Sequence, residues 1–80
     1  MNKNNYYEAI GWYGFVALLL AYAIVSFGFV NGNNVYYQLL NFTGAVGIAW
    51  ISLEEKTYQP AVLNIIWAII ALIILIKITT

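Results

Sequence analysis

Residues 9–53, AIGWYGFVALLLAYAIVSFGFVNGNNVYYQLLNFTGAVGIAWISL, contain no charged side chain. A second uncharged run, residues 57–76, follows the short charged segment Glu54-Glu55-Lys56. A helix needs about 20 predominantly apolar residues to cross a bilayer. The first run therefore has room for two crossings and the second has room for one. The charge pattern predicts three membrane-spanning helices.

The composition favours the same class. Hydrophobic residues make up 64% of the 80-residue chain and charged residues only 8%, whereas an ordinary soluble domain has about 25% charged residues. The chain has no cysteine and no histidine, so neither a disulfide nor a zinc site could stabilise so short a soluble fold. A soluble helical bundle and a cleaved signal peptide over the first apolar run are the alternatives.

Turn signals divide the chain into its expected spans. The Asn and Gly residues at positions 31–34 tolerate positive φ and mark a tight turn, and Pro60 suits the first turn of a helix. Strands are excluded because an open sheet edge leaves backbone groups unpaired in lipid. We expect an all-α membrane protein, a single membrane domain over residues 1–80, with three transmembrane helices in a compact up-down-up bundle. The predicted spans are residues 11–30, 35–53 and 61–78.

Aromatic residues gather near the ends of these spans, where tyrosine and tryptophan favour the membrane interface. The predicted interface anchors are Trp12, Tyr13, Tyr36, Tyr37 and Tyr58.

The lysines set the expected orientation. With three spans, the N-terminus and the second connection lie on one side of the membrane, and they carry Lys3 and Lys56. The opposite side carries only Lys77. The positive-inside rule then predicts a cytoplasmic N-terminus in a multi-pass inner-membrane protein.

Each predicted helix carries a stripe of small or polar side chains when it is drawn at 100° per residue. The small members, expected to allow close packing of helices, are Gly14, Ala21, Gly28, Gly44, Ala45, Ala68 and Ala71. The polar members are Gln38, Asn41, Ser52 and Asn64, with Trp50 and Tyr22 as further candidates. Exposing an amide to acyl chains costs more than the roughly 0.6 kcal/mol that an interhelical hydrogen bond returns. The amides should therefore face protein, as helix-packing contacts, or a polar pocket at mid-membrane.

The usual chemistry of an active site is missing from the sequence. Without histidine or cysteine, the commonest general bases, thiol nucleophiles and soft metal ligands are excluded. The three acidic residues lie outside the predicted spans, and the adjacent pair Glu54 and Glu55 would point about 100° apart on a helix. We therefore expect no enzyme, no metal site and no cofactor. The formal net charge of zero gives no indication of a nucleic-acid partner.

Three segments of the chain resemble a family of small bacterial inner-membrane proteins of unknown function. These segments are WYGFVALLLAYAIVSFG, YYQLLNFTGAVG and TYQPAVLNIIWAIIAL. The shared features are an aromatic-Gly start of the first span, YQLLN…GA in the second, and Y-x-P-A-x-x-N-x-x-W in the third. The resemblance covers Trp12 to about Leu72. It implies a three-helix membrane fold and brings no assigned activity.

A second resemblance, one of architecture, is to the SemiSWEET sugar transporters. These are three-helix units that dimerise around a substrate path, with a tryptophan of the second helix and an asparagine of the third facing the sugar. Trp50 and Asn64 occupy comparable places here, and Pro60 opens the third span. The first helix departs from that family, because its Pro-Gln motif is absent and the first span has no proline.

These observations leave two hypotheses for function. In the first, the protein acts through helix–helix assembly, as a homo-oligomer or as an accessory subunit of a larger membrane complex. In the second, two or more copies form a transporter or pore for a small neutral polar solute. Its path would be lined by Gln38, Asn41, Asn64 and either Trp50 or Tyr22.

Overall fold

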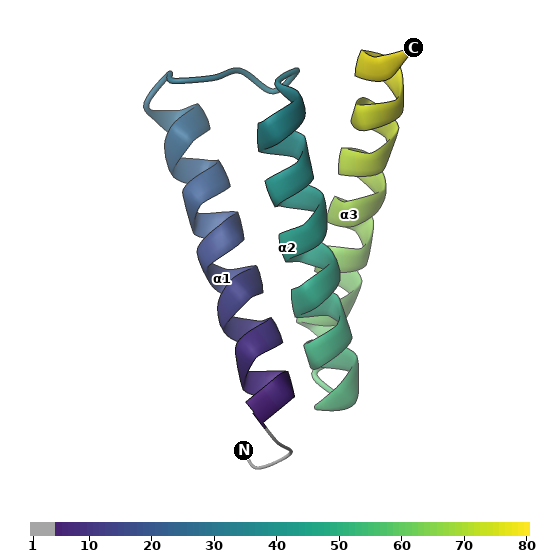
Figure 1. Ribbon diagram of the computed structural model, residues 1–80. Helices are drawn as coiled ribbons and strands as arrows, with labels where there is room; N and C mark the ends of the chain where they lie inside the picture. The colour runs from purple at the N-terminus through teal and green to yellow at the C-terminus, as the bar shows by residue number, and fades with distance from the viewer. Residues whose placement is uncertain (1–4) are drawn as a thin grey trace.

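The computed structural model describes residues 5–80 and contains three α-helices joined by two connections (Figure 1). The helices are α1 (Asn5–Ser26), α2 (Val35–Glu54) and α3 (Tyr58–Thr79). They run up, down and up, and α2 lies between the other two (Figure 1). Within residues 5–80 there is no strand. The predicted all-α class with three helices is confirmed.

The packing is more open than the compact bundle that we expected. Helices α1 and α3 each pack along α2, but no contact joins α1 to α3 in the described part of the chain. Figure 1 shows the three helices side by side, with α1 and α3 on different flanks of α2. Helix α2 therefore supplies every interhelical contact of the fold.

Helix α1 begins and ends earlier than predicted. The expected span was residues 11–30, but the helix ends at Ser26 because Gly28 adopts a positive φ of 82°. The amide groups of residues 28 and 29 donate to the carbonyls of Val25 (3.2 Å) and Ile24 (2.9 Å). This pair of bonds is the Schellman arrangement that commonly terminates helices at glycine. Gly28 was predicted to pack against a neighbouring helix, and this was wrong: it is exposed, and a Cβ at this position would meet nothing within 4 Å.

The other helix boundaries follow local chemistry. Asn34 caps α2 by accepting a hydrogen bond from the Tyr37 amide at 3.0 Å. Helix α2 matches its predicted range to within one residue. Helix α3 begins at Tyr58, three residues before the predicted start, and Pro60 lies in its first turn, where an amide hydrogen is not needed. Lys3, one of the lysines behind the expected orientation, lies outside the described residues.

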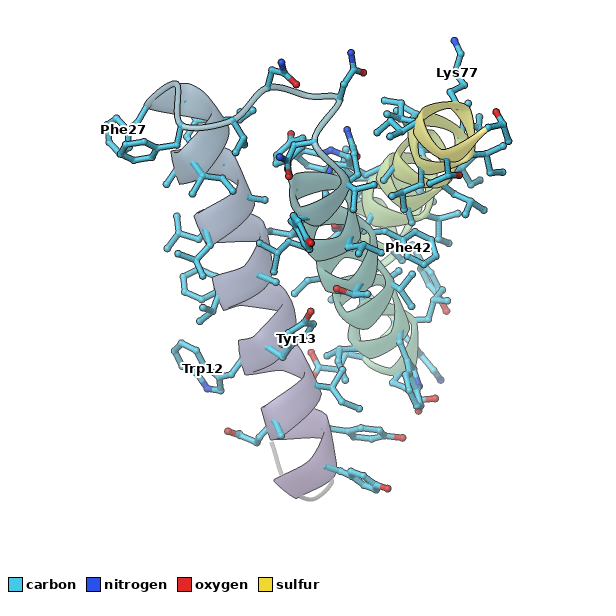
Figure 2. All side chains as sticks on the ribbon, turned by 45° about the horizontal axis from the view of Figure 1, so that its top comes forward. Trp12, Tyr13, Phe27, Phe42 and Lys77 are labelled. Atoms are coloured by element: carbon cyan, nitrogen blue, oxygen red, sulfur yellow. The ribbon has the colours of Figure 1, made fainter. Side chains whose placement is uncertain are left out.

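The interior contains only small side chains and amides. No leucine, isoleucine, valine or aromatic residue is buried in residues 6–80. The buried residues are Gly14, Ala17, Ala21, Gln38, Asn41, Gly44, Ala45, Gly47, Ala49, Ser52, Ala61, Asn64, Ala68 and Ala71. Figure 2 shows the larger side chains projecting outward from the helices, as Trp12 and Phe27 do.

Glycine brings α1 and α2 into close contact. A Cβ built on Gly14 would lie 2.9 Å from the Gly44 carbonyl oxygen, and one on Gly44 would lie 3.1 Å from Cβ of Ala17. A Cβ on Gly47 would lie 3.5 Å from the Ile10 carbonyl oxygen. Small residues at these positions let the two backbones approach each other, which is the main way that helices pack without large side chains.

Two of the helices are long and apolar enough to cross a membrane. These are residues Tyr6–Ser26 of α1 and the whole of α3. The polar side chains and glycines of α2 lower its hydropathy, so length and composition alone do not single it out. The crossing of a membrane by all three helices therefore remains a prediction.

Replacing Gly14 with alanine tests the close contact. We expect Gly14→Ala to lower the free energy of unfolding by about 1–3 kcal/mol, the usual cost of overpacking, because its Cβ meets a backbone carbonyl that cannot move alone. Gly11→Ala is the matched control, because its Cβ meets nothing within 4 Å and alanine favours the helix by up to about 1 kcal/mol. Unfolding of the purified protein in detergent, followed by circular dichroism, gives both values. Equal stability of the two variants would contradict the contact.

Candidate functional site

The polar residues predicted as a site divide into a buried group and an exposed pair. The buried side chains are Gln38, Asn41, Ser52 and Asn64, which are 3%, 7%, 7% and 6% exposed. Trp50 is 49% exposed and Tyr22 is 69% exposed. The structure therefore does not bring Trp50 or Tyr22 into the interior with the amides.

Gln38 organises the connection between α1 and α2. Its Nε2 donates to the Gly32 carbonyl at 2.7 Å. In the same connection, Asn31 Oδ1 accepts from the Asn33 amide at 2.9 Å, and Asn34 caps α2. The Gln38 Oε1 atom is buried and has no hydrogen-bond partner. The Gln38 side chain thus attaches the loop to α2. This role accounts for the hydrogen bond of Nε2, but it does not account for the burial of Oε1.

Asn64 makes its one hydrogen bond within its own helix. Its Nδ2 donates to the carbonyl of Pro60 at 2.9 Å, one turn earlier in α3. Its Oδ1 atom is buried without a partner. A buried unpaired acceptor costs about 1–3 kcal/mol, so this oxygen is a position where a hydrogen-bond donor would stabilise the fold.

The three amides do not form one pocket. Asn41 lies 13 residues before Glu54, the end of α2, and Asn64 lies 6 residues after Tyr58, the start of α3. At about 1.5 Å per residue, these positions are roughly 20 and 9 Å from the connection that joins the antiparallel helices. Asn41 and Asn64 are therefore separated by about 10 Å along the helix axes, whereas Ser52 and Asn64 lie near the same end.

The predicted small-residue contacts are mostly buried between helices. Gly14, Gly44, Ala21, Ala45, Ala68 and Ala71 all lie in the interior. Gly47, Ala49 and Ala61 are also buried, although none of them was among the predicted close-packing residues. The spacings of three or four residues that link them to Gly44, Ala45 and Asn64 would have indicated them, because such spacings keep small residues on one helix face.

One predicted anchor, Tyr13, takes part in a contact between helices. Thr43 Oγ1 lies 2.9 Å from the Leu39 carbonyl and donates to it. The hydroxyl hydrogen of Thr43 is then engaged, so Tyr13 donates to Thr43 Oγ1 across the 2.6 Å between them. Figure 2 shows Tyr13 directed toward α2 and Trp12 directed away from it. Trp12, Tyr36 and Tyr58 are exposed, and Tyr37 is half-buried.

The buried set can bind by hydrogen bonding, but it offers little acid–base chemistry. Amides and a serine hydroxyl donate and accept hydrogen bonds without ionising near neutral pH. In residues 5–80, no group of three or more histidine, cysteine or acidic residues is placed to hold a metal ion. Gln38, Asn41 and Asn64 also line none of the five surface grooves described for residues 5–80.

Comparison with known proteins places the chain in a family. A protein-family model matches residues 7–80, and the family has no assigned activity. No curated protein and no solved structure matches the chain.

The loop contact of Gln38 can be tested by hydrogen exchange. We expect Gln38→Met to speed amide exchange in residues 27–34 severalfold, because a net hydrogen bond of about 0.5–1.5 kcal/mol to the loop is lost. Asn41→Leu is the matched control one turn along α2, since the Asn41 side chain makes no hydrogen bond with the described residues. If both variants exchange like the parent protein in this loop, the contact does not hold the connection.

Proposed function

Since the chain belongs to this family without an assigned activity, its function has to be argued from the structure. We propose that it is a three-span inner-membrane protein that works through helix–helix contacts. It would act as a homo-oligomer or as an accessory subunit of a larger membrane complex.

The observation that carries the proposal is the inverted distribution of side chains. The interior holds glycine, alanine, serine and amides, whereas the large apolar residues cover the outside. Exposed examples from all three helices are Phe15, Leu19, Val46, Leu53, Ile66 and Ile70. A soluble monomer rarely exposes an apolar patch of more than a few hundred Å². Lipid acyl chains are a favourable environment for such a surface.

Helix α2 fits the role of the third span despite its lower hydropathy. It has 20 residues, which correspond to about 30 Å, the thickness of the hydrocarbon core. Its amides Gln38 and Asn41 and its Ser52 are buried against the neighbouring helices. Polar side chains that are turned inward do not meet lipid, so the average hydropathy of α2 underestimates how apolar its outer face is.

The open packing of the three helices supports a function through helix–helix contacts with another protein or a second copy. Because α1 and α3 do not touch each other, α2 keeps a wide exposed strip formed by Leu39, Val46, Trp50 and Leu53. Trp50 and Leu53 also border a groove of about 380 Å³ between α2 and α3, together with Ile65 and Ile69. A helix of another protein, or of a second copy, could pack into such a strip without rearrangement of the fold. The transporter alternative has less support, because the amides line none of the described grooves.

Single cysteines can test the three-span topology, because the chain has no cysteine of its own. We expect Asn33→Cys and Thr80→Cys to react with an impermeant maleimide on one side of the membrane. Lys56→Cys should react only from the other side, the cytoplasmic one. Labelling of intact cells and of inverted vesicles gives the two accessibilities. If Asn33→Cys and Lys56→Cys react from the same side, α2 does not cross and the proposal fails.

Crosslinking in native membranes tests the assembly, and Asn64→Leu separates it from transport. We expect crosslinked species larger than the monomer in the parent protein. Asn64→Leu should assemble normally, because the unpaired Oδ1 is removed together with only one hydrogen bond inside its own helix. A monomer without any partner would contradict the assembly proposal. Normal assembly with loss of a measurable solute flux would support the transporter alternative.

A further inference from the structure

A groove of about 270 Å³ lies along the N-terminal part of α1. It is lined by Tyr7, Glu8, Gly11, Trp12, Phe15 and Ile51. Five of these residues belong to α1 and one to the end of α2. The lining therefore combines a carboxylate, three aromatic rings and an aliphatic side chain around a glycine.

Glu8 is the charged group of this groove, and its charge is not neutralised within the described residues. The basic residues there are Lys56 and Lys77, and neither forms an ion pair with Glu8. The Glu8 carboxylate is part of the groove lining itself, whereas Glu54 and Glu55 are not. At contact distance, this carboxylate attracts a cationic group and repels an anionic one.

The aromatic wall and the glycine give the groove its shape. The rings of Trp12 and Phe15 lie 5.6 Å apart at an interplanar angle of 87°. The missing side chain of Gly11 leaves open space, because a Cβ there would meet nothing within 4 Å. The Trp12 side chain points away from α2 (Figure 2). The Trp12 indole nitrogen makes no hydrogen bond with the described part of the chain, so its N–H is free to donate.

We propose that this groove binds a phospholipid whose headgroup carries a primary ammonium. The inference rests on the proposed membrane location. The ammonium pairs with the Glu8 carboxylate, the indole N–H of Trp12 donates to the phosphate, and an acyl chain lies against Phe15 and Ile51. The aromatic rings add a cation–π attraction for the same ammonium.

The order of these residues along α1 matches the order of groups in such a lipid. Glu8 lies three residues and Phe15 ten residues from Asn5, the start of the helix. At about 1.5 Å per residue these distances are roughly 5 and 15 Å. The carboxylate therefore lies at headgroup depth, and Phe15 lies within the acyl region. A phospholipid with an anionic headgroup would instead place a negative charge beside Glu8.

Native mass spectrometry of the full-length protein tests the site. The protein is released from nanodiscs that contain equal amounts of phosphatidylethanolamine and phosphatidylglycerol. We expect the parent protein to retain phosphatidylethanolamine in preference to phosphatidylglycerol. Glu8→Gln should reduce this retention about tenfold, as expected when a hydrogen bond between charged groups is lost. Gly11→Leu should reduce it similarly by filling the groove. Glu55→Gln, which removes a carboxylate outside the groove, should leave it unchanged.

Two outcomes would overturn the inference. One is equal retention of both lipids by the parent protein, and the other is unchanged retention in both Glu8→Gln and Gly11→Leu. Incorporation into the nanodisc is recorded on the same samples. A chain that enters the bilayer without preference for phosphatidylethanolamine refutes the lipid site alone. A chain that stays outside the bilayer refutes the proposed function together with the site.

Discussion

The close approach of α1 and α2 at Gly14 and Gly44 is the contact on which the N-terminal half of the fold depends. A single methyl group at Gly14 would lie 2.9 Å from a carbonyl oxygen of the facing helix. Because α1 does not touch α3, no other helix could compensate for the loss of this contact. The Tyr13–Thr43 hydrogen bond and the inward faces of Ala17 and Gly47 are possible only at this short separation.

The buried amides make different contacts, although in the sequence all of them are polar members of the predicted helix stripes. Gln38 donates to the loop before α2, and Asn64 donates to its own helix. Both leave a buried oxygen without a partner. Asn41 is buried at a height between those of Gln38 and Asn64 along the helix axes, and it makes no hydrogen bond with the described residues. The polar stripe is thus a series of separate positions along the helices, and helix packing accounts for it better than a continuous path does.

The number of helices, the turn before α2 and the burial of the amides could be predicted from the sequence. The spacing of the charged residues predicts the number of helices, and the Asn and Gly residues predict the turn. The free-energy cost of exposing an amide to an apolar environment predicts that the amides are buried. The end of α1 could not be predicted in this way, because Phe27 and Phe29 continue the apolar run while Gly28 adopts a conformation that stops the helix. The separation of Asn41 from Asn64 along the helix axes could not be predicted either. The sequence gives the direction in which each side chain leaves its own helix, but it does not give the height of that side chain relative to residues of the neighbouring helix. Tyr22 and Trp50 lie on the outside of the three-helix unit for a related reason: its interior admits only small side chains and amides.

The interior of small side chains also determines which mutations this protein can accumulate. In the proposed membrane location, exchanges among leucine, isoleucine, valine and phenylalanine on the outer faces would change little, because lipid adapts to the new shape. An added methylene at Gly14, Gly44 or Ala45 has no free volume to enter. The information that specifies the fold is therefore concentrated in the smallest residues and their spacing of three and four. Divergent copies of this chain would keep that spacing while their large apolar residues drift.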